Sequence, residues 1–139
     1  MLVILSAACS PNAHNKKLPA FMIGQFEDDY GIQYQIDQGT FVLLPNDKFH
    51  IIRVDTIQRY LILHNDSLNA FAPSLYSRID YQTLKNMAPF QWAFCFSNYE
   101  EESYIDALSK QNKSKSDLMK GCNGFPFSRM KSKHTRNNN

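Results

Sequence analysis

The sequence PFQWAFCFSNY, residues 89–99, decides the fold of this chain. It holds the only tryptophan and one of three cysteines. The run is short, aromatic and bounded by a proline, which favours a β-strand over a helix. Strand alternation predicts four large rings on one face and smaller side chains on the other: Phe90, Trp92, Phe94 and Phe96 against Gln91, Ala93 and Cys95. We interpret it as the core strand; the alternative is a ring-lined ligand pocket.

Length and composition indicate one folded domain. The chain has 139 residues, of which 43% are hydrophobic, enough for a core. Charge is unevenly distributed: residues 1–109 carry seven Lys/Arg and twelve Asp/Glu, and residues 110–139 carry eight and one. A basic terminus can contact anionic lipid or nucleic acid. Aromatic residues are scarce there, which argues against nucleic acid as a partner.

The first nine residues, MLVILSAAC, have the pattern of an export signal. They are apolar, end in small residues and a cysteine, and are too few to cross a bilayer. They resemble the end of a bacterial lipoprotein signal peptide, in which a cysteine after a Leu-small-small box is lipidated. The resemblance implies a lipid on Cys9 and a membrane-anchored position on the periplasmic side of the bacterial envelope. The alternative is a buried N-terminal strand.

Short apolar or alternating segments separated by turn residues follow one another through the body of the chain. We expect about seven strands, in segments 21–26, 31–36, 40–44, 48–54, 59–64, 75–81 and 89–96. Ser97 and Asn98 are expected to cap one short helix over residues 99–109. The predicted fold is mainly β, an antiparallel meander that forms either a small barrel or a strongly curled sheet. The predicted domain organisation is a signal remnant and linker (1–17), one β-rich domain (18–130) and a disordered basic tail (131–139).

Four motifs carry a second resemblance: residues 24–34, 77–81 (SRIDY), 92–95 (WAFC) and 121–128 (GCNGFPFS). This layout is similar to a group of small uncharacterised bacterial envelope lipoproteins with a lipocalin-like barrel. Gly24 and Phe26 echo the Gly-x-Trp that opens lipocalin barrels. The resemblance covers most of residues 21–130 and implies a compartment and a fold but no chemistry.

Cys95 and Cys122 are expected to form a disulfide. If Cys9 is lipidated, two cysteines remain, and cysteines of exported proteins usually pair. The bond would close a loop of about 27 residues and contribute roughly 3 kcal/mol. In a cytosolic chain both would instead be reduced, buried thiols.

Two pairs of charged residues are candidates for chemistry. Asp28 and Asp29 could serve as an acid–base pair or a calcium corner, but adjacent strand residues face opposite ways, which favours a turn-forming role. Arg78 and Asp80 share one strand face, where they could pair structurally, or Arg78 could bind a carboxylate ligand. His50 and His64 lie on expected strands without an evident carboxylate or thiol partner. No metal-ligand spacing, phosphate loop or nucleophile–base motif occurs.

These observations predict a noncatalytic, exported, lipid-anchored β-domain without a cofactor that binds a small molecule or a partner protein at the envelope. Its ligand site would be an open barrel end lined by aromatic residues and Arg78: Tyr34, Tyr60, Tyr76 and Trp92. The alternative is an assembly or interaction protein with a filled barrel and no ligand cavity. The third hypothesis is that the chain is an enzyme.

Overall fold

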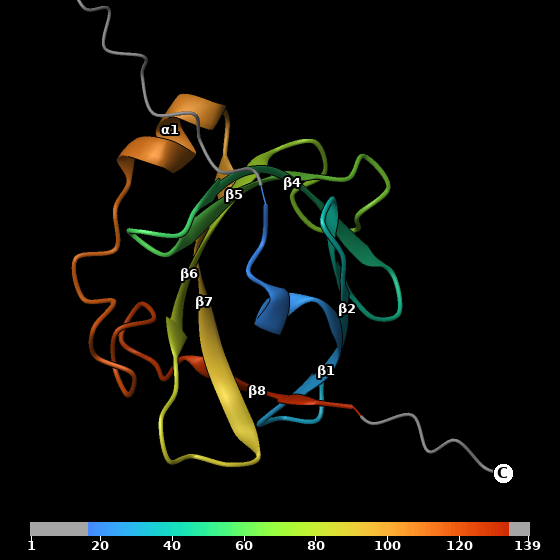
Figure 1. The fold of residues 1–139 in the computed structure, drawn as a ribbon. Coiled ribbons are helices and arrows are strands. Elements are labelled where there is room, and N and C mark those ends of the chain that lie inside the picture. Colours follow the sequence, from blue (N-terminus) through green and yellow to red (C-terminus); the bar gives the residue numbers. More distant parts are fainter. Residues whose placement is uncertain (1–16, 134–139) are drawn as a thin grey trace, which may run out of the picture.

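A computed structural model describes residues 17–133 as a closed β-barrel (Figure 1). Eight antiparallel strands follow one another in sequence order, and the last pairs with the first to close the barrel. They are β1 (Gly24–Asp28), β2 (Gln33–Ile36), β3 (Thr40–Leu43), β4 (Asp47–Asp55), β5 (Tyr60–Asn65), β6 (Tyr76–Thr83), β7 (Phe90–Glu101) and β8 (Ser128–Ser132). The predicted mainly β meander is confirmed as a barrel. It has eight strands rather than about seven, because β8 completes the ring.

Turn residues connect these strands as the sequence predicted. Between β2 and β3, Asp37 Oδ1 accepts hydrogen bonds from the backbone N–H groups of Gly39 and Thr40, at 2.9 and 2.8 Å. Between β1 and β2, Gly31 has a φ of +79°, a conformation that glycine adopts without a steric penalty. Side-chain hydrogen bonds in one hairpin and a glycine conformation in the other thus favour tight turns, which help to set the register of the strands.

Strand β7 supplies the rings that fill the barrel, which confirms its interpretation as the core strand. Its side chains meet rings from β1 to β4 at centroid distances of 5.1–5.4 Å: Trp92 with Phe26, Phe94 with Tyr34 and Phe41, and Phe96 with Phe49. Most of these contacts are edge-to-face, the geometry that aromatic quadrupoles favour. Opposite walls of the barrel therefore meet through aromatic side chains.

Phe90 departs from this pattern. The pairing of β7 with β8 shifts register between Phe90 and Trp92, and such a bulge reverses the alternation of side chains. The Phe90 ring instead lies 4.2 Å from the guanidinium carbon of Arg129. The expectation that four rings of this strand share one face is therefore wrong for Phe90.

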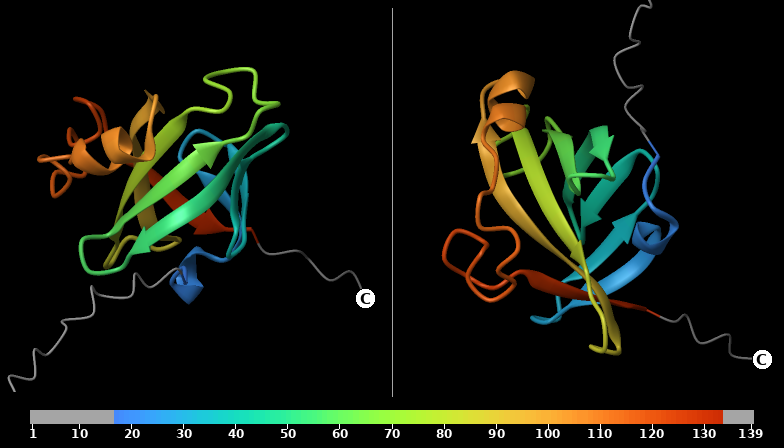
Figure 2. Two further views of the ribbon diagram at one scale, coloured as in Figure 1. Left: turned by 90° about the horizontal axis from the view of Figure 1, so that it is seen from above. Right: turned by 60° about the vertical axis from the view of Figure 1, so that its left-hand side comes forward.

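One end of the barrel is closed by the chain that precedes β1. The short 3₁₀ helix η1 (Ala20–Met22) places Met22, together with Leu18, in the core cluster. The Leu18 N–H donates a 2.8 Å hydrogen bond to Gln38 Oε1, which holds this segment against the β2–β3 turn. The turns that join β2 to β3, β4 to β5 and β6 to β7 lie at the same end of the barrel, on the lower side of the left view in Figure 2. We call this end the plugged end; it consists of residues 17–23, 37–39, 56–59 and 84–89.

The opposite end carries the longer connections. We call residues 29–32, 44–46 and 66–75, with the connection 102–127, the loop end; the hairpin loops lie on the upper side of the left view in Figure 2. Its longest connection, between β7 and β8, contains helix α1 (Tyr104–Ser109). This connection packs along the outside of the barrel, where α1 contacts β5, β6 and β7. The middle of the connection runs down the outside of the barrel, where Lys115 Nζ donates to the Gln58 carbonyl and Leu118 shares a cluster with Leu84.

Helix α1 is shorter than predicted. Residues 99–101 continue β7, because Glu101 still pairs with Tyr76 of β6, and tertiary pairing overrides the acidic helix-start pattern. The N-cap is Ser103, whose Oγ accepts a 3.1 Å hydrogen bond from the Asp106 N–H. The expected start at residue 99 and the expected cap at Ser97 and Asn98 are therefore wrong.

The predicted ends of the domain are tested only in part. Strand β8 runs to Ser132, and the Lys133 N–H donates to the Gln25 carbonyl at 2.9 Å, so the ordered domain extends beyond residue 130. The predicted lipidation site Cys9, the signal remnant up to residue 16 and the predicted tail from residue 134 lie outside the described residues.

Candidate functional site

The residues predicted to line one ligand site are separated by the barrel wall. Tyr34 and Trp92 lie inside the barrel, where they belong to the main core cluster. Tyr60, Tyr76 and Arg78 lie on the outer face of β5 and β6, beneath the connection that carries α1. The structure does not bring the five residues together, and the expectation of one open barrel end lined by them is wrong. Trp92 is a packing residue of the interior, whereas Tyr34 also lines a hollow at the barrel mouth.

Tyr60 and Tyr76 belong to a second, smaller cluster. They pack with side chains of α1, namely Tyr104, Ala107 and Leu108. Strand β5 is therefore covered on both faces: Leu61 and Leu63 face the barrel interior, and Tyr60 and Ile62 face α1. This double covering explains why β5 is apolar at successive positions.

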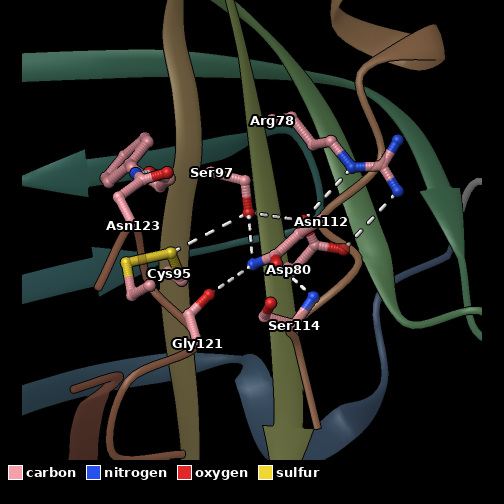
Figure 3. Close-up of a disulfide and its surroundings, with 10 residues drawn as sticks. Arg78, Asp80, Cys95, Ser97, Asn112, Ser114, Gly121 and Asn123 are labelled. Carbon is pink, nitrogen blue, oxygen red and sulfur yellow. Dashed lines mark hydrogen bonds and ion pairs between the residues drawn. A yellow bond between two sulfur atoms is a disulfide. The ribbon is translucent and has the colours of Figure 1, made fainter. Parts of the chain in front are cut away.

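Arg78 is a structural residue rather than a ligand-binding one. Its side chain is 2% exposed and its Nε lies 3.2 Å from Asp80 Oδ2. The guanidinium also donates to the Leu108 carbonyl at 2.9 Å and stacks 4.1 Å from the Tyr60 ring centroid. Asp80 in turn accepts a 2.6 Å hydrogen bond from Ser97 Oγ (Figure 3). This buried pair fastens the connection 102–127 to the barrel.

The predicted disulfide between Cys95 and Cys122 is confirmed (Figure 3). Cys95 lies on the outer face of β7 beside Ala93, where Phe127 packs over both. Gly121 permits the close approach of this segment, because a Cβ there would collide with the carbonyl oxygens of Ser114 and Asp117. The bond holds the second half of the connection 102–127 against β7.

Apolar side chains remain exposed mainly around the loop end. Large exposed side chains there are Tyr30, Ile32, Leu44, Leu68, Phe71, Tyr99, Ile105 and Phe125. Met119 of the same connection lines a hollow together with Met87 of the plugged end. Leu68 is 90% exposed and Phe71 is 61% exposed. At the plugged end the corresponding side chains are Ile23, Ile57 and Met87. The loop end thus carries the larger apolar surface, a feature typical of interaction sites.

Two hollows of about 440 and 460 Å³ lie along the connection 102–127, and two smaller ones at the loop end share Phe96 in their lining. The first of the smaller two, the Phe71 hollow, has a volume of about 250 Å³ and is lined by Asp47, Phe49, Asn65, Phe71, Ala72, Phe96 and Tyr99. The Phe71 and Tyr99 rings lie 5.4 Å apart at its rim. Asn65 fixes the adjoining loop by donating to the carbonyls of Ala72 and Tyr99, at 2.9 and 3.0 Å.

The second hollow, the Asp28 hollow, has a volume of about 280 Å³. It is lined by Asp28, Tyr30, Ile32, Tyr34, Leu43, Phe94, Phe96, Ser128 and the disulfide. Asp28 is 3% exposed and faces inward from β1. Its Oδ1 accepts from the backbone N–H groups of Tyr30 and Ile32 at 2.8 and 3.0 Å, and its Oδ2 accepts from Tyr34 Oη at 2.7 Å.

Electrostatics keep the Tyr34 hydroxyl protonated. Burial, and next the hydrogen bond to the Asp28 carboxylate and its negative charge, raise the pKa of Tyr34 far above the usual value near 10. Tyr34 is therefore a permanent donor to Asp28. Asp29 points elsewhere, with its carboxylate 2.9 Å from Arg129 Nη2, so the two aspartates do not share a site. The turn-forming role predicted for Asp28 is confirmed.

His50 has a carboxylate partner that the sequence did not reveal. Its Nε2 lies 2.8 Å from Asp66 Oδ1, across the β4–β5 pairing. The hydrogen bond from His50, and next that from the Leu68 N–H, lower the pKa of Asp66. His64 stacks on Tyr76, with ring centroids 4.9 Å apart. Both histidines stabilise local structure around the loop end.

Comparison with protein-family models, curated proteins and solved structures gave no match. Within residues 17–133, no three His, Cys, Asp or Glu side chains gather as a metal site requires. In the same part of the chain, no helix combines the length and apolarity that a membrane crossing needs. The candidate site therefore rests on the geometry of the loop end.

Sequence reasoning missed the pairing of Asp28 with Tyr34, although a signal for it was present. Aligning the β1–β2 hairpin about its Asp-Asp-Tyr-Gly turn sets Phe26 opposite Tyr34, and places Asp28 on the same face. The apolar loop-end residues gave no such signal, because isolated Leu, Phe and Tyr residues in loops have no periodicity.

Proposed function

We propose that this chain is an exported, lipid-anchored, noncatalytic domain of the bacterial envelope that binds a partner protein at the loop end of its barrel. The observation that carries the proposal is the contrast between a filled interior and an apolar loop end. Ring contacts from β7 reach across the barrel at 5.1–5.4 Å. Recognition is therefore assigned to the outside, where Leu68, Phe71 and Phe125 are exposed.

A small molecule at the same end is the second candidate, and the two hollows favour it. Each has a volume of 250–280 Å³, slightly below the range of about 300–1,000 Å³ that is common for small-molecule sites. Such a hollow holds a head group or one side chain rather than an enclosed ligand. Both candidates thus use the loop end, and neither uses the barrel centre.

The disulfide supports the proposed compartment. Structural disulfides persist in oxidising compartments and are rare in the cytosol. The Cys95–Cys122 bond therefore agrees with export, and the pattern of residues 1–9 adds the lipid on Cys9. The intact mass of the native protein, isolated from membranes without reductant, tests both. A chain that begins at Cys9 with acyl groups and an oxidised cysteine pair is expected; an unmodified, reduced chain starting at Met1 would refute export and the anchor.

Site-specific photo-crosslinking in the native host tests the binding site. A benzophenone amino acid replaces Phe71 at the loop end, and in a matched control it replaces Ile57, which is 88% exposed at the plugged end. We expect one discrete adduct from position 71 and none from position 57. If the mass of the crosslinked chain increases by that of a protein, the partner is a protein. If the increase is below 1 kDa, the partner is a small molecule. Equal labelling of the two positions, or none, would refute a partner or ligand seated beside Phe71.

A further inference from the structure

The Asp28 hollow contains a buried carboxylate with no cationic partner. Asp28 is 3% exposed, and among residues 17–133 no Lys, Arg or His nitrogen pairs with it. Its neighbour Asp29 is paired with Arg129. Burying an unpaired charge is costly, so it usually indicates hydrogen bonds that stabilise the anion, or a cation that completes the site.

The hydrogen bonds around Asp28 leave room for one more donor. A carboxylate offers about four lone-pair sites. Two on Oδ1 are occupied by the Tyr30 and Ile32 N–H groups, and one on Oδ2 is occupied by the Tyr34 hydroxyl. One acceptor site on Oδ2 remains, on a side chain that lines the hollow.

The walls of the hollow suit the apolar part of a cation. Aromatic side chains that line it are Tyr30, Tyr34, Phe94 and Phe96, and aromatic faces attract ammonium groups. Leu43 and Ile32 add aliphatic surface. The volume of about 280 Å³ accommodates an ammonium group on a short aliphatic stem.

We propose that the Asp28 hollow binds a primary alkylammonium group, which donates a hydrogen bond to Asp28 Oδ2 and lies against the aromatic walls. The inference rests on the proposed function, because it places the recognised group at the loop end. The same group occurs on a free amine and on the lysine side chain of a partner protein. Charge complementarity selects the ammonium over neutral or anionic groups in both cases.

Titration followed by two-dimensional ¹H–¹⁵N NMR at pH 7 and constant ionic strength tests this inference. The probes are n-butylammonium chloride, its neutral counterpart n-butanol, and N-acetyl-lysine-N-methylamide. We expect saturable shifts of the Asp28 and Phe96 amides with both cations, and at least tenfold weaker binding of n-butanol. Tighter binding of the lysine derivative than of n-butylammonium indicates a protein source, and the reverse order indicates a free amine. No saturable binding of either cation, or equal binding of n-butanol, would overturn the proposal.

Variants separate the charge from the fold. Asp28→Asn keeps the acceptor for the turn N–H groups but removes the negative charge, and we expect at least tenfold weaker binding of n-butylammonium. Asp29→Asn changes the net charge by the same amount one residue away and serves as the control. Its affinity for n-butylammonium is expected to lie within twofold of that of the natural protein. Phe96→Leu removes one aromatic wall and should weaken binding at least twofold. Equal affinity of the Asp28→Asn and Asp29→Asn proteins, both shown to be folded by their NMR spectra, would overturn the assignment.

The two proposals fail separately. A discrete adduct from position 71 in the crosslinking experiment, combined with no cation binding, refutes the ammonium site alone. Cation binding that depends on Asp28, without any adduct, supports the site and refutes a partner seated beside Phe71.

Discussion

The two ends of the barrel are held together by different interactions. At the plugged end, Leu18 and Met22 are almost fully buried and close the core with apolar side chains. At the loop end, the connections are fastened by the Cys95–Cys122 disulfide, by the buried Arg78–Asp80 pair and by side-chain amides such as that of Asn65. Apolar clusters under α1 and around Phe127 also hold the connection 102–127, but the exposed side chains of Leu68 and Phe71 take no part in these clusters. That surface is available for recognition.

The largest expected effect comes from breaking the buried ion pair that fastens the connection 102–127 to the barrel. Asp80→Ala leaves the Arg78 guanidinium buried without its carboxylate, and the free energy of unfolding should fall by about 3–5 kcal/mol. Urea denaturation measures the change. Glu102→Ala, an exposed carboxylate of the same connection, is the control and should change it by less than about 0.5 kcal/mol. A loss below about 1 kcal/mol for Asp80→Ala would show that the pair does not fasten the connection.

Truncating one apolar side chain at each end sharpens the comparison. Met22→Ala removes a fully buried side chain from the plugged end and should cost about 2–5 kcal/mol of unfolding free energy. Phe71→Ala removes a larger side chain from the loop end but should cost less than about 1 kcal/mol, because Phe71 is mostly exposed. Urea denaturation of the two variants measures both changes in unfolding free energy. Equal costs would mean that the loop end is held together by its apolar residues.

Removing the disulfide should destabilise the loop end specifically. The bond spans 27 residues, so the double variant Cys95→Ala/Cys122→Ala should lose about 3 kcal/mol of unfolding free energy. Hydrogen exchange should show lost protection for residues 118–127 and retained protection at the plugged end. If protection fell equally at both ends, the disulfide would stabilise the whole barrel rather than one connection.

The smallest expected effect is electrostatic and again differs between the ends. Hydrogen bonds lower the pKa of Asp37 in the plugged-end turn, chiefly from the Gly39 N–H, and of Asp66 at the loop end, chiefly from His50. His50→Ala should raise the pKa of Asp66 toward the usual value of about 3.9 and leave that of Asp37 unchanged. Carboxyl ¹³C titration by NMR measures both values.

The pH dependence of that contact follows from the direction of the shift. A carboxyl group whose pKa is lowered by folding stabilises the folded state above its unfolded pKa, and this contribution disappears as the pH falls through the lowered value. The natural protein and His50→Ala should therefore differ in free energy of unfolding above about pH 3.9, by the contribution of the Asp66 carboxyl group. This difference should vanish in stronger acid. An unchanged pKa of Asp66 in the variant would contradict the contact.

The sequence predicted the antiparallel meander, as a small barrel or a curled sheet, because its strands are marked by alternation and its turns by Asp and Gly. It did not predict β8, since residues 128–132 (SRMKS) include only one apolar side chain, Met130. It placed the helix start too early because the pairing of Glu101 with Tyr76 is a long-range contact. The disulfide was predictable from the number of cysteines together with the predicted export signal.

The ligand site could not be predicted from alternation alone. Alternation assigns a side chain to one of two faces but does not say which face is inside when both are covered. Tyr34 and Tyr60 both follow strand patterns, yet Tyr34 lies in the barrel and Tyr60 under α1. Only the closed topology distinguishes the two faces.

The positions of the chain ends have a consequence for orientation. Leu18 is bonded to the β2–β3 turn and Lys133 to the start of β1, so both ends of the described chain leave from the plugged end. A lipid on Cys9, eight residues before Lys17, would hold that end within roughly 29 Å of the bilayer surface, the reach of eight extended residues. The Phe71 and Asp28 hollows would then point away from the membrane, toward molecules that approach from the periplasm.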